Sequence, residues 1–154
     1  MTREVAELWL LVRAGGHLCA LPLEHVDETM RPQPVRVLAG VPTFVRGVTV
    51  IRGRPVPVVD AACAIGQAEP SSNGTRFVAL KTAERCVALA VDEVVGVRQI
   101  NHRHLADVPP LLAGANEHVV SAIGTLDSEL LMVLRSGKLV SETAWAAIEA
   151  GDRR

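Results

Sequence analysis

The chain has 154 residues, 49% of them apolar and 21% charged, which is the composition of a globular protein and excludes disorder for most of its length. The net charge is −1 and aromatic residues make up only 3%, so neither a basic face nor base-stacking side chains point to nucleic acid. No stretch approaches the ~20 consecutive apolar residues of a membrane-spanning helix, and the apolar run 8–12 is too short for a signal-peptide core. We therefore expect a cytoplasmic protein that does not insert into a membrane.

Valine occurs 23 times and Phe and Trp only twice each, and a core of this kind favours sheet over helix. In the first half, apolar and β-branched runs predict strands over 8–14, 17–21, 26–30, 45–51 and 54–59. Gly15-Gly16 and Arg52-Gly53 are turn signals between neighbouring strands. Pro55 and Pro57 cannot donate to a strand ladder, so their strand is expected at an edge or beside a bulge.

The second half continues the same pattern after a polar stretch, 67–75, which predicts an exposed hairpin or a boundary between halves. Strands are predicted over 76–80, 86–91, 94–100, 119–126 and 129–134. The segments 32–43 and 101–117 contain prolines and are interpreted as loops, and 61–65 as one helical turn. Helical spacing over 139–150 predicts a terminal helix, with Ser136 and Ser141 as candidate caps.

An internal repeat relates the two halves. The segment 20–23 matches 88–91 at an offset of 68, and 51–59 matches 126–134 at an offset of 75. Each match has the pattern of a strand, a turn and a strand. The repeat predicts two similar β units of about five strands each, which pack on one another because each buries little alone.

Few residues point to catalysis. The sequence has no P-loop, dinucleotide-binding, HExxH or GxSxG motif, so an enzyme is not the favoured class. His102 and His104 are two residues apart, so in an extended segment their side chains would lie on the same face and could bind a metal ion together. His118 lies in the same loop. A small metal-dependent enzyme is therefore the remote alternative, and a solvated loop is the favoured interpretation. Asp92 and Glu93 are adjacent at a strand end, so they point to opposite sides.

Other polar residues have structural or binding interpretations. Asp60 follows a strand and is expected to cap the helical turn at 61–65. Arg46, Arg52 and Arg54 gather around one hairpin, where they are either solvated or used in partner recognition. The three cysteines have no CxxC spacing and lie in apolar surroundings, and are interpreted as buried reduced thiols.

Several motifs occur in a fixed order over about residues 6–145: ALPLxxVxE (20–28), PxFxRGV (42–48), IRGxxVPVVD (51–60), VALAVDxV (87–94) and the run from Ile123-Gly124 to Leu134. In this order they resemble the CheW-like coupling domain of bacterial chemotaxis. The resemblance implies an all-β fold of two SH3-like five-stranded barrels packed side by side, with a short C-terminal helix at about 139–150. Residues 1–154 would form a single CheW-like domain, with approximate lobes 1–70 and 71–140 and exchange of strands allowed.

The resemblance also implies a function without catalysis and without a cofactor. Such adaptors bind a CheA-type histidine kinase through its regulatory domain and the cytoplasmic tip of methyl-accepting chemoreceptors, which recruits them to membrane receptor arrays. The motif positions carried over as partner-binding are Val26, Glu28, Gly47, Arg52 and Val94. Val26 and Val94 occupy equivalent places in the repeat, which suits a groove between the barrels that accepts an apolar helical hairpin.

Two positions depart from the family pattern. Val50 stands where Asn or Asp is frequent, and Ala61 follows Asp60 where Leu is usual. The alternative is therefore an accessory CheW-like adaptor of a different chemosensory or motility system.

Overall fold

The computed structural model describes residues 7–67, 70, 76–82, 85–108 and 119–152. Within these residues the strands are β1 (Glu7–Ala14), β2 (His17–Pro22), β3 (Val26–Met30), β4 (Val45–Ile51), β5 (Arg54–Asp60), β6 (Arg76–Thr82), β7 (Arg85–Val91), β8 (Glu93–Ile100), β9 (Leu105–Ala106), β10 (Val120–Leu126) and β11 (Glu129–Leu134). The helices are α1 (Ala61–Ala64) and α2 (Glu142–Asp152), with 3₁₀ turns η1 (Leu23–His25), η2 (His102–His104) and η4 (Ser136–Lys138).

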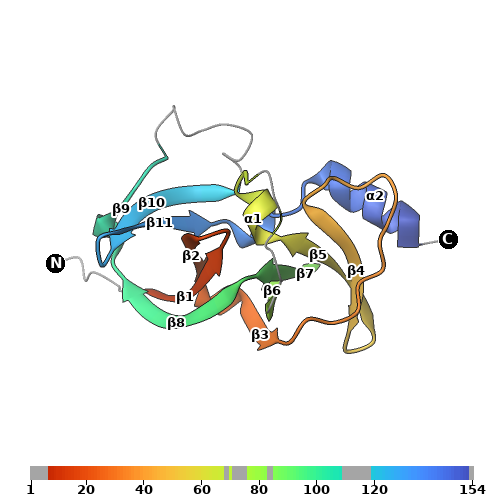
Figure 1. The fold of residues 1–154 in the computed structure, drawn as a ribbon, viewed down its shortest axis with the longest axis horizontal. Helices are drawn as coiled ribbons and strands as arrows, with labels where there is room; N and C mark the ends of the chain where they lie inside the picture. Colours follow the sequence, from red (N-terminus) through yellow and green to blue (C-terminus); the bar gives the residue numbers. More distant parts are fainter. Residues whose placement is uncertain (1–6, 68–69, 71–75, 83–84, 109–118, 153–154) are drawn as a thin grey trace.

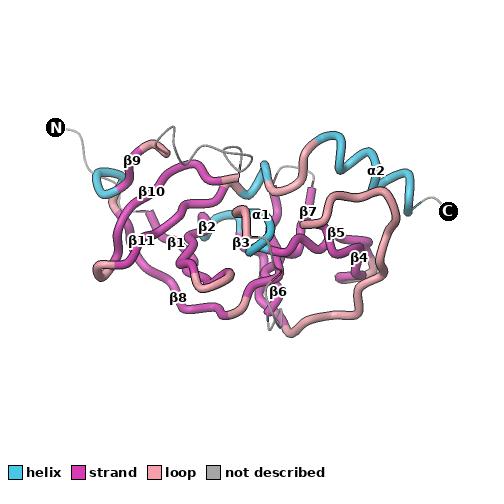
Figure 2. Tube along the Cα trace, turned by 45° about the horizontal axis from the view of Figure 1, so that its top comes forward, coloured by secondary structure: helices cyan, strands magenta, loops and turns pink. Residues whose placement is uncertain are grey.

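The strands form two sheets that lie side by side (Figure 1). One sheet has the order β8-β1-β2-β11-β10-β9 and is called here the six-stranded lobe. The other has the order β3-β6-β7-β5-β4 and is called the five-stranded lobe, with α2 at its outer side (Figure 2). The predicted all-β fold of two small units with a C-terminal helix is confirmed, and the sixth strand is β9, which falls inside a segment predicted as loop.

Neither lobe is one half of the chain. The hairpin β1–β2 joins strands of the second half in the six-stranded lobe, and the hairpin β6–β7 joins strands of the first half in the five-stranded lobe. Two parallel pairings, β2 with β11 and β5 with β7, make these connections. The sequence predicts approximate lobes 1–70 and 71–140 with possible exchange of strands. In the structure each sheet contains strands from both of these ranges.

The internal repeat is confirmed by strand register. Trp9 pairs with Pro22, and the residues 68 positions further on, Phe77 and Ala90, also pair. The β4–β5 and β10–β11 hairpins share their register and the position of a bulge at an offset of 75. Residues of the two lobes can therefore be compared position by position, with 68 as the offset for β1–β3 and 75 for β4–β5.

The core consists of three clusters. Each lobe has its own, centred on Trp9 and Leu131 in the six-stranded lobe and on Phe77 and Val58 in the five-stranded lobe. The third cluster is shared between the lobes and contains residues of β1, β2, β4 to β7 and α2. Because some strands are buried on both faces, they read in the sequence as continuous apolar runs.

Element ends differ from the predictions by a few residues. The terminal helix begins at Glu142, later than the predicted 139, because Ser141 accepts a hydrogen bond from Ala144 N at 3.1 Å and caps it. The polar stretch 67–75 lies largely outside the described residues. Of the three cysteines, only Cys19 is buried, and burial raises the pKa of its thiol to about 12. No helix in the described part of the chain is long and apolar enough to span a membrane.

Candidate partner-binding surfaces

The predicted site residues fall on both lobes. Val26 opens β3 and pairs with Leu80, and its equivalent Val94 lies at the start of β8 and pairs with Val12. Both valines are half-buried and pack against the cluster that the lobes share. The structure therefore places both where the two lobes meet, at the starts of the strands that form one edge of each sheet.

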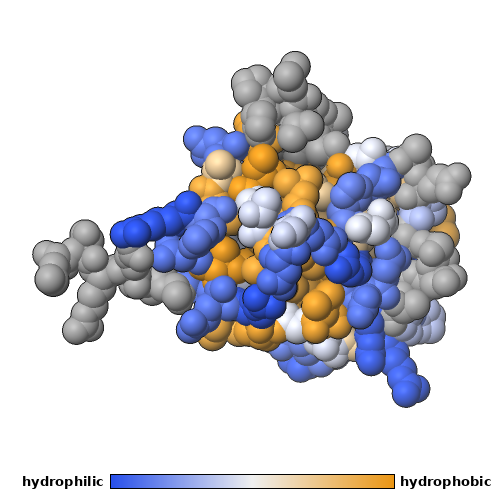
Figure 3. Space-filling view, turned by 60° about the vertical axis from the view of Figure 1, so that its left-hand side comes forward, coloured by the Kyte–Doolittle hydropathy of each residue, from blue (hydrophilic) through white to orange (hydrophobic). Residues whose placement is uncertain are grey.

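Exposed apolar side chains extend this region on the six-stranded lobe. Leu8, Val95 and Val97 expose 46%, 47% and 48% of their surface. Leu8 and Val97 are diagonal neighbours across β1 and β8, and Val95 lies at a bulge of the same pairing. Figure 3 shows apolar surface between polar side chains on the side of the molecule that lies at the left in Figure 1. The set Val26, Val94, Leu8, Val95 and Val97 is called the junction face.

One surface cleft lies at the start of β8 and a second lies at the start of β1. Val94 lines one of about 460 Å³ together with Thr29 of β3 and Arg76. Leu8 lines the other, of about 520 Å³, with Leu23. Leu8 is the repeat equivalent of Arg76, so one cleft is more polar and the other more apolar.

Glu28 and Arg52 are brought together by the fold. Arg52 lies in the β4–β5 turn with a φ of +51°, and its Nη2 is 3.1 Å from Glu28 Oε1. Its Nη1 is 3.5 Å from Asp27 Oδ2. The Arg52 side chain remains 68% exposed, so the ion pairs orient a guanidinium that still faces solvent.

Gly47 acts through the backbone. It is buried at a bulge of β4 with a φ of +146°, and a Cβ there would lie 2.1 Å from the carbonyl oxygen of Arg36. Arg36 and Val48 exchange two backbone hydrogen bonds of 2.8 and 2.9 Å at this point. Gly47 therefore allows the loop after β3 to pack against β4 and shapes the surface rather than contacting a partner by a side chain.

Arg46 does not share the setting of Arg52. Its guanidinium binds the buried carboxylate of Asp60, with Nε 3.0 Å from Oδ2. The other oxygen of Asp60 accepts from Cys63 N at 3.0 Å and caps α1, so the predicted cap is confirmed. From the sequence, Arg46 was expected to be either solvated or used in partner recognition. The structure instead gives it a structural contact, because Asp60 is buried beside it.

The candidate metal pair lacks its expected geometry. His102 and His104 lie in the 3₁₀ turn η2 and not in an extended segment, so residues two apart do not share a face. His102 Nε2 is 3.0 Å from Glu7 Oε1, and His118 lies outside the described residues. In the part of the chain that the structure describes, no group of three His, Cys, Asp or Glu could hold a metal.

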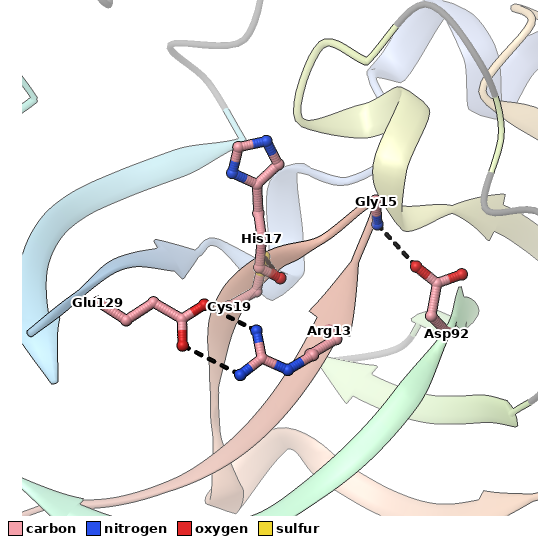
Figure 4. Close-up of polar contacts among 6 residues, drawn as sticks. All are labelled: Arg13, Gly15, His17, Cys19, Asp92 and Glu129. Carbon is pink, nitrogen blue, oxygen red and sulfur yellow. Dashed lines mark hydrogen bonds and ion pairs between the residues drawn. The ribbon is translucent and has the colours of Figure 1, made fainter. Parts of the chain in front are cut away.

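Asp92 stabilises the segment in which the chain passes from the five-stranded lobe to the six-stranded lobe. Its carboxylate accepts from Gly15 N at 2.8 Å (Figure 4). Its own N–H donates to the carbonyl of Arg13 at 2.8 Å. These bonds tie the segment between β7 and β8 to the β1–β2 turn. Asp92 thus contributes to lobe packing and is not half of an acid–base pair with Glu93.

A groove of about 580 Å³ has no counterpart among the features predicted from the sequence. It lies between the β4–β5 hairpin, the β6–β7 hairpin and α2, and is called the helix groove. Its apolar lining consists of Val48, Ile51, Pro55, Val56, Pro57, Cys86, Trp145 and Ile148. Its charged lining consists of Asp27, Arg52, Arg54, Lys81, Arg85 and Glu149. The sequence holds no signal for it because α2 comes from the opposite end of the chain.

One wall of the helix groove is held by Arg85. Its guanidinium binds Glu142 of α2 at 2.7 and 3.1 Å and lies 4.7 Å from the centre of the Trp145 ring. The hydrogen bond raises the pKa of Arg85 and lowers that of Glu142. These contacts attach α2 to the β6–β7 hairpin.

The family model of the CheW-like domain matches residues 8–144, which include both lobes and the start of α2. The chain belongs to the CheW-like domain family. The chemotaxis protein CheW of Klebsiella aerogenes is 24% identical over 146 residues, which cover 94% of this chain and 88% of the relative. Protein FrzA of Myxococcus xanthus is 29% identical over 141 residues, covering 88% and 86%. Protein PilI of Pseudomonas aeruginosa is 29% identical over 115 residues, covering 72% and 65%.

The fold is also similar to a solved member of the family. The crystal structure of the scaffolding protein TtCheW from Thermoanaerobacter tengcongensis superposes with a TM-score of 0.78 at 19% identity, covering 91% of this chain and 96% of that chain. The resemblance found in the motifs is therefore confirmed for family and fold. The roles of the five site residues stay predictions.

Proposed function

We propose that this CheW-like chain is a non-catalytic cytoplasmic adaptor that couples methyl-accepting chemoreceptors to a CheA-type histidine kinase. The family match over both lobes is the observation that carries the proposal. Exposed apolar side chains near the boundary between the lobes support it. An adaptor needs surfaces for two partners and no reaction centre. Its action would be to hold kinase and receptor together at membrane receptor arrays.

The junction face is the proposed contact for the receptor. The exposed Leu8, Val95 and Val97 lie on the paired strands β1 and β8, and Val94 lies at the start of β8. With Val26 of β3 they would offer apolar contacts to an apolar helical hairpin from the receptor tip. The more polar cleft, beside Val94, would help to set the orientation of the helices.

The turn that carries Arg52 is the proposed contact for the regulatory domain of the kinase. Arg52 is held by Glu28 and stays exposed, and an arginine in such a setting is favoured in interface hot spots. Gly47 shapes this surface indirectly, because the absence of a side chain lets the loop at Arg36 pack against β4. A change at Gly47 would therefore reach the partner through backbone shape.

Two observations support an alternative, in which the chain serves a different chemosensory or motility system. Val50 is 65% exposed beside the Arg52 turn, so an apolar side chain faces solvent where the family often has Asn or Asp. Two relatives at 29% identity carry the names PilI and FrzA and not CheW. The alternative is an accessory adaptor of another chemosensory or motility system, with the same fold and a different kinase.

The test is binding of the purified chain to the regulatory domains of the CheA-type kinases of its own organism, measured by titration calorimetry. Saturable binding to the main chemotaxis kinase, weakened by Arg52→Ala, would support the coupling function. Binding only to the kinase of another system would move the chain to an accessory pathway. Binding to none of them would overturn the proposal.

A further inference from the structure

The start of β8 is attached to β1 by a short stretch of ladder. The pairing of the two strands is interrupted by a bulge at Val95. On one side of the bulge five residue pairs hold 96–100, and on the other side only two pairs hold Glu93 and Val94. β8 is also the edge strand of its sheet, so its start has no second neighbouring strand. Because two pairs at the end of an edge strand open at little cost, the position of Val94 depends on what fixes that end.

Asp92 fixes the end of the short stretch by two hydrogen bonds. Its carboxylate points toward the β1–β2 turn and accepts from Gly15 N at 2.8 Å (Figure 4). Its N–H donates to the carbonyl of Arg13 at 2.8 Å. The attachment of β8 to β1 therefore continues past the last residue pair, and one of its two bonds is strengthened by the charge of the carboxylate.

The β1–β2 turn is held in place by contacts that do not involve Asp92. The guanidinium of Arg13 donates to both oxygens of Glu129 at 2.7 and 3.0 Å, which connects the turn to the β10–β11 hairpin (Figure 4). His17 Nε2 lies 2.9 Å from Gln67 Nε2, which connects the turn to the segment after α1. Loss of the Asp92 carboxylate should therefore free the start of β8 and leave the turn where it is.

The five-stranded lobe fixes the equivalent valine in another way. Val26 follows η1 directly, and its N–H donates to the carbonyl of Leu23. The residue equivalent to Asp92 at the offset of 68 is Glu24, whose side chain is 81% exposed. The position of Val94 thus depends on a side chain, where that of Val26 depends on a backbone hydrogen bond.

We infer that Asp92 is a positioning residue for the receptor contact, because it holds Val94 and Val95 of the junction face against β1. The inference rests on the proposed function, which assigns the junction face to the receptor. The turn that carries Arg52 belongs to the five-stranded lobe, which shares no strand with β8. Loss of the Asp92 bonds should therefore weaken the receptor contact and spare the kinase contact.

The test is Asp92→Ala in the full chain, titrated by calorimetry with two ligands from its own organism. One is a soluble cytoplasmic fragment of a methyl-accepting chemoreceptor, and the other is the regulatory domain of the CheA-type kinase that the parent chain binds. The variant should bind the receptor fragment at least about fivefold less tightly, since binding must then also order the start of β8. Its affinity for the kinase domain should stay within about twofold of the parent value.

Asp92→Asn is the conservative variant. It removes the same charge as Asp92→Ala and keeps a side-chain oxygen that accepts from Gly15 N, so it should restore receptor affinity to within about twofold of the parent. Ser141→Ala is the matched control, because it also removes a bond from a side-chain oxygen to a backbone N–H, that of Ala144 at 3.1 Å in α2. It should leave receptor affinity within about twofold. If Asp92→Ala fails to fold, Asp92→Glu, which displaces the carboxylate by one methylene, replaces it with the same expected direction.

Hydrogen exchange followed by mass spectrometry examines the start of β8 without a ligand. Asp92→Ala should speed amide exchange in 93–95 and leave exchange in 97–100 close to that of the parent. Unchanged exchange in 93–95, equal losses of affinity for both ligands, or an Asn variant as weak as the Ala variant would overturn the inference. A parent chain that binds no receptor fragment would overturn the proposed receptor coupling and this role with it. Receptor binding that Asp92→Ala leaves unchanged would overturn this role alone.

Discussion

Replacing Gly47 by alanine should lower the free energy of unfolding by about 3–5 kcal/mol, a large part of the roughly 5–15 kcal/mol that a domain has. The backbone at Gly47 has a φ of +146°, where an L residue is strained by about 1–3 kcal/mol. The new Cβ would also lie 2.1 Å from the carbonyl oxygen of Arg36. Relieving that clash breaks the two hydrogen bonds between Arg36 and Val48, at about 1 kcal/mol each.

Gly53→Ala is the matched control. Gly53 also has a positive φ, +77°, but nothing lies within 4 Å of a Cβ built there. The cost should then be the conformational one alone, about 1–2 kcal/mol. Urea unfolding followed by circular dichroism measures both variants at one temperature. If Gly47→Ala and Gly53→Ala lose the same free energy within about 1 kcal/mol, the close approach to Arg36 has no energetic weight and the reasoning fails.

Four further outcomes are expected. Asp60→Ala should lower the free energy of unfolding by about 3–5 kcal/mol, because the half-buried Arg46 guanidinium loses that carboxylate and α1 loses its cap. Urea unfolding measures the change, and a loss of stability below about 1 kcal/mol would contradict this reasoning. Val94→Met should weaken binding of the receptor tip while the thermal midpoint stays near that of the parent chain, and unchanged binding would remove Val94 from the site. Burial raises the pKa of the Cys19 thiol from 9.0 to about 12, so the folded chain keeps a proton that the unfolded chain loses. The stabilisation from this thiol is present below pH 9 and is lost between pH 9 and 12, and Cys19→Ala should flatten that slope in thermal melts. The pKa of Glu142 is lowered by Arg85, so its contribution is lost as pH falls through the lowered value, and Glu142→Gln should reduce the acid sensitivity of α2.

Much of the fold was predictable because local patterns carry it. The β-branched runs located the strands, and the turn residues Gly15-Gly16 and Arg52-Gly53 located hairpins whose central residues have positive φ. The two offsets of the repeat hold in the strand registers, since equivalent residues face equivalent neighbours. The short strand β9 was missed because two residues give no periodicity to detect.

The candidate site was predictable only in part. Motif positions located Val26 and Val94, but the pairing of Arg52 with Glu28 joins residues on separate strands, which spacing along the chain does not reveal. Arg46 and Arg52 look alike in the sequence, and only the position of the buried Asp60 separates a structural arginine from an exposed one.

The amino-acid order alone determines that the chain is a β-rich duplicated unit of the CheW-like family, because composition, turn chemistry and motif order are properties of neighbouring residues. The tertiary structure decides which hairpin joins which sheet, since alternation fixes the faces of a strand and not its partner. It also decides that Arg13 meets Glu129, and that Lys81 and Arg54 both line the helix groove. Contacts of this kind depend on segments far apart in the chain, and packing of the shared core brings them together.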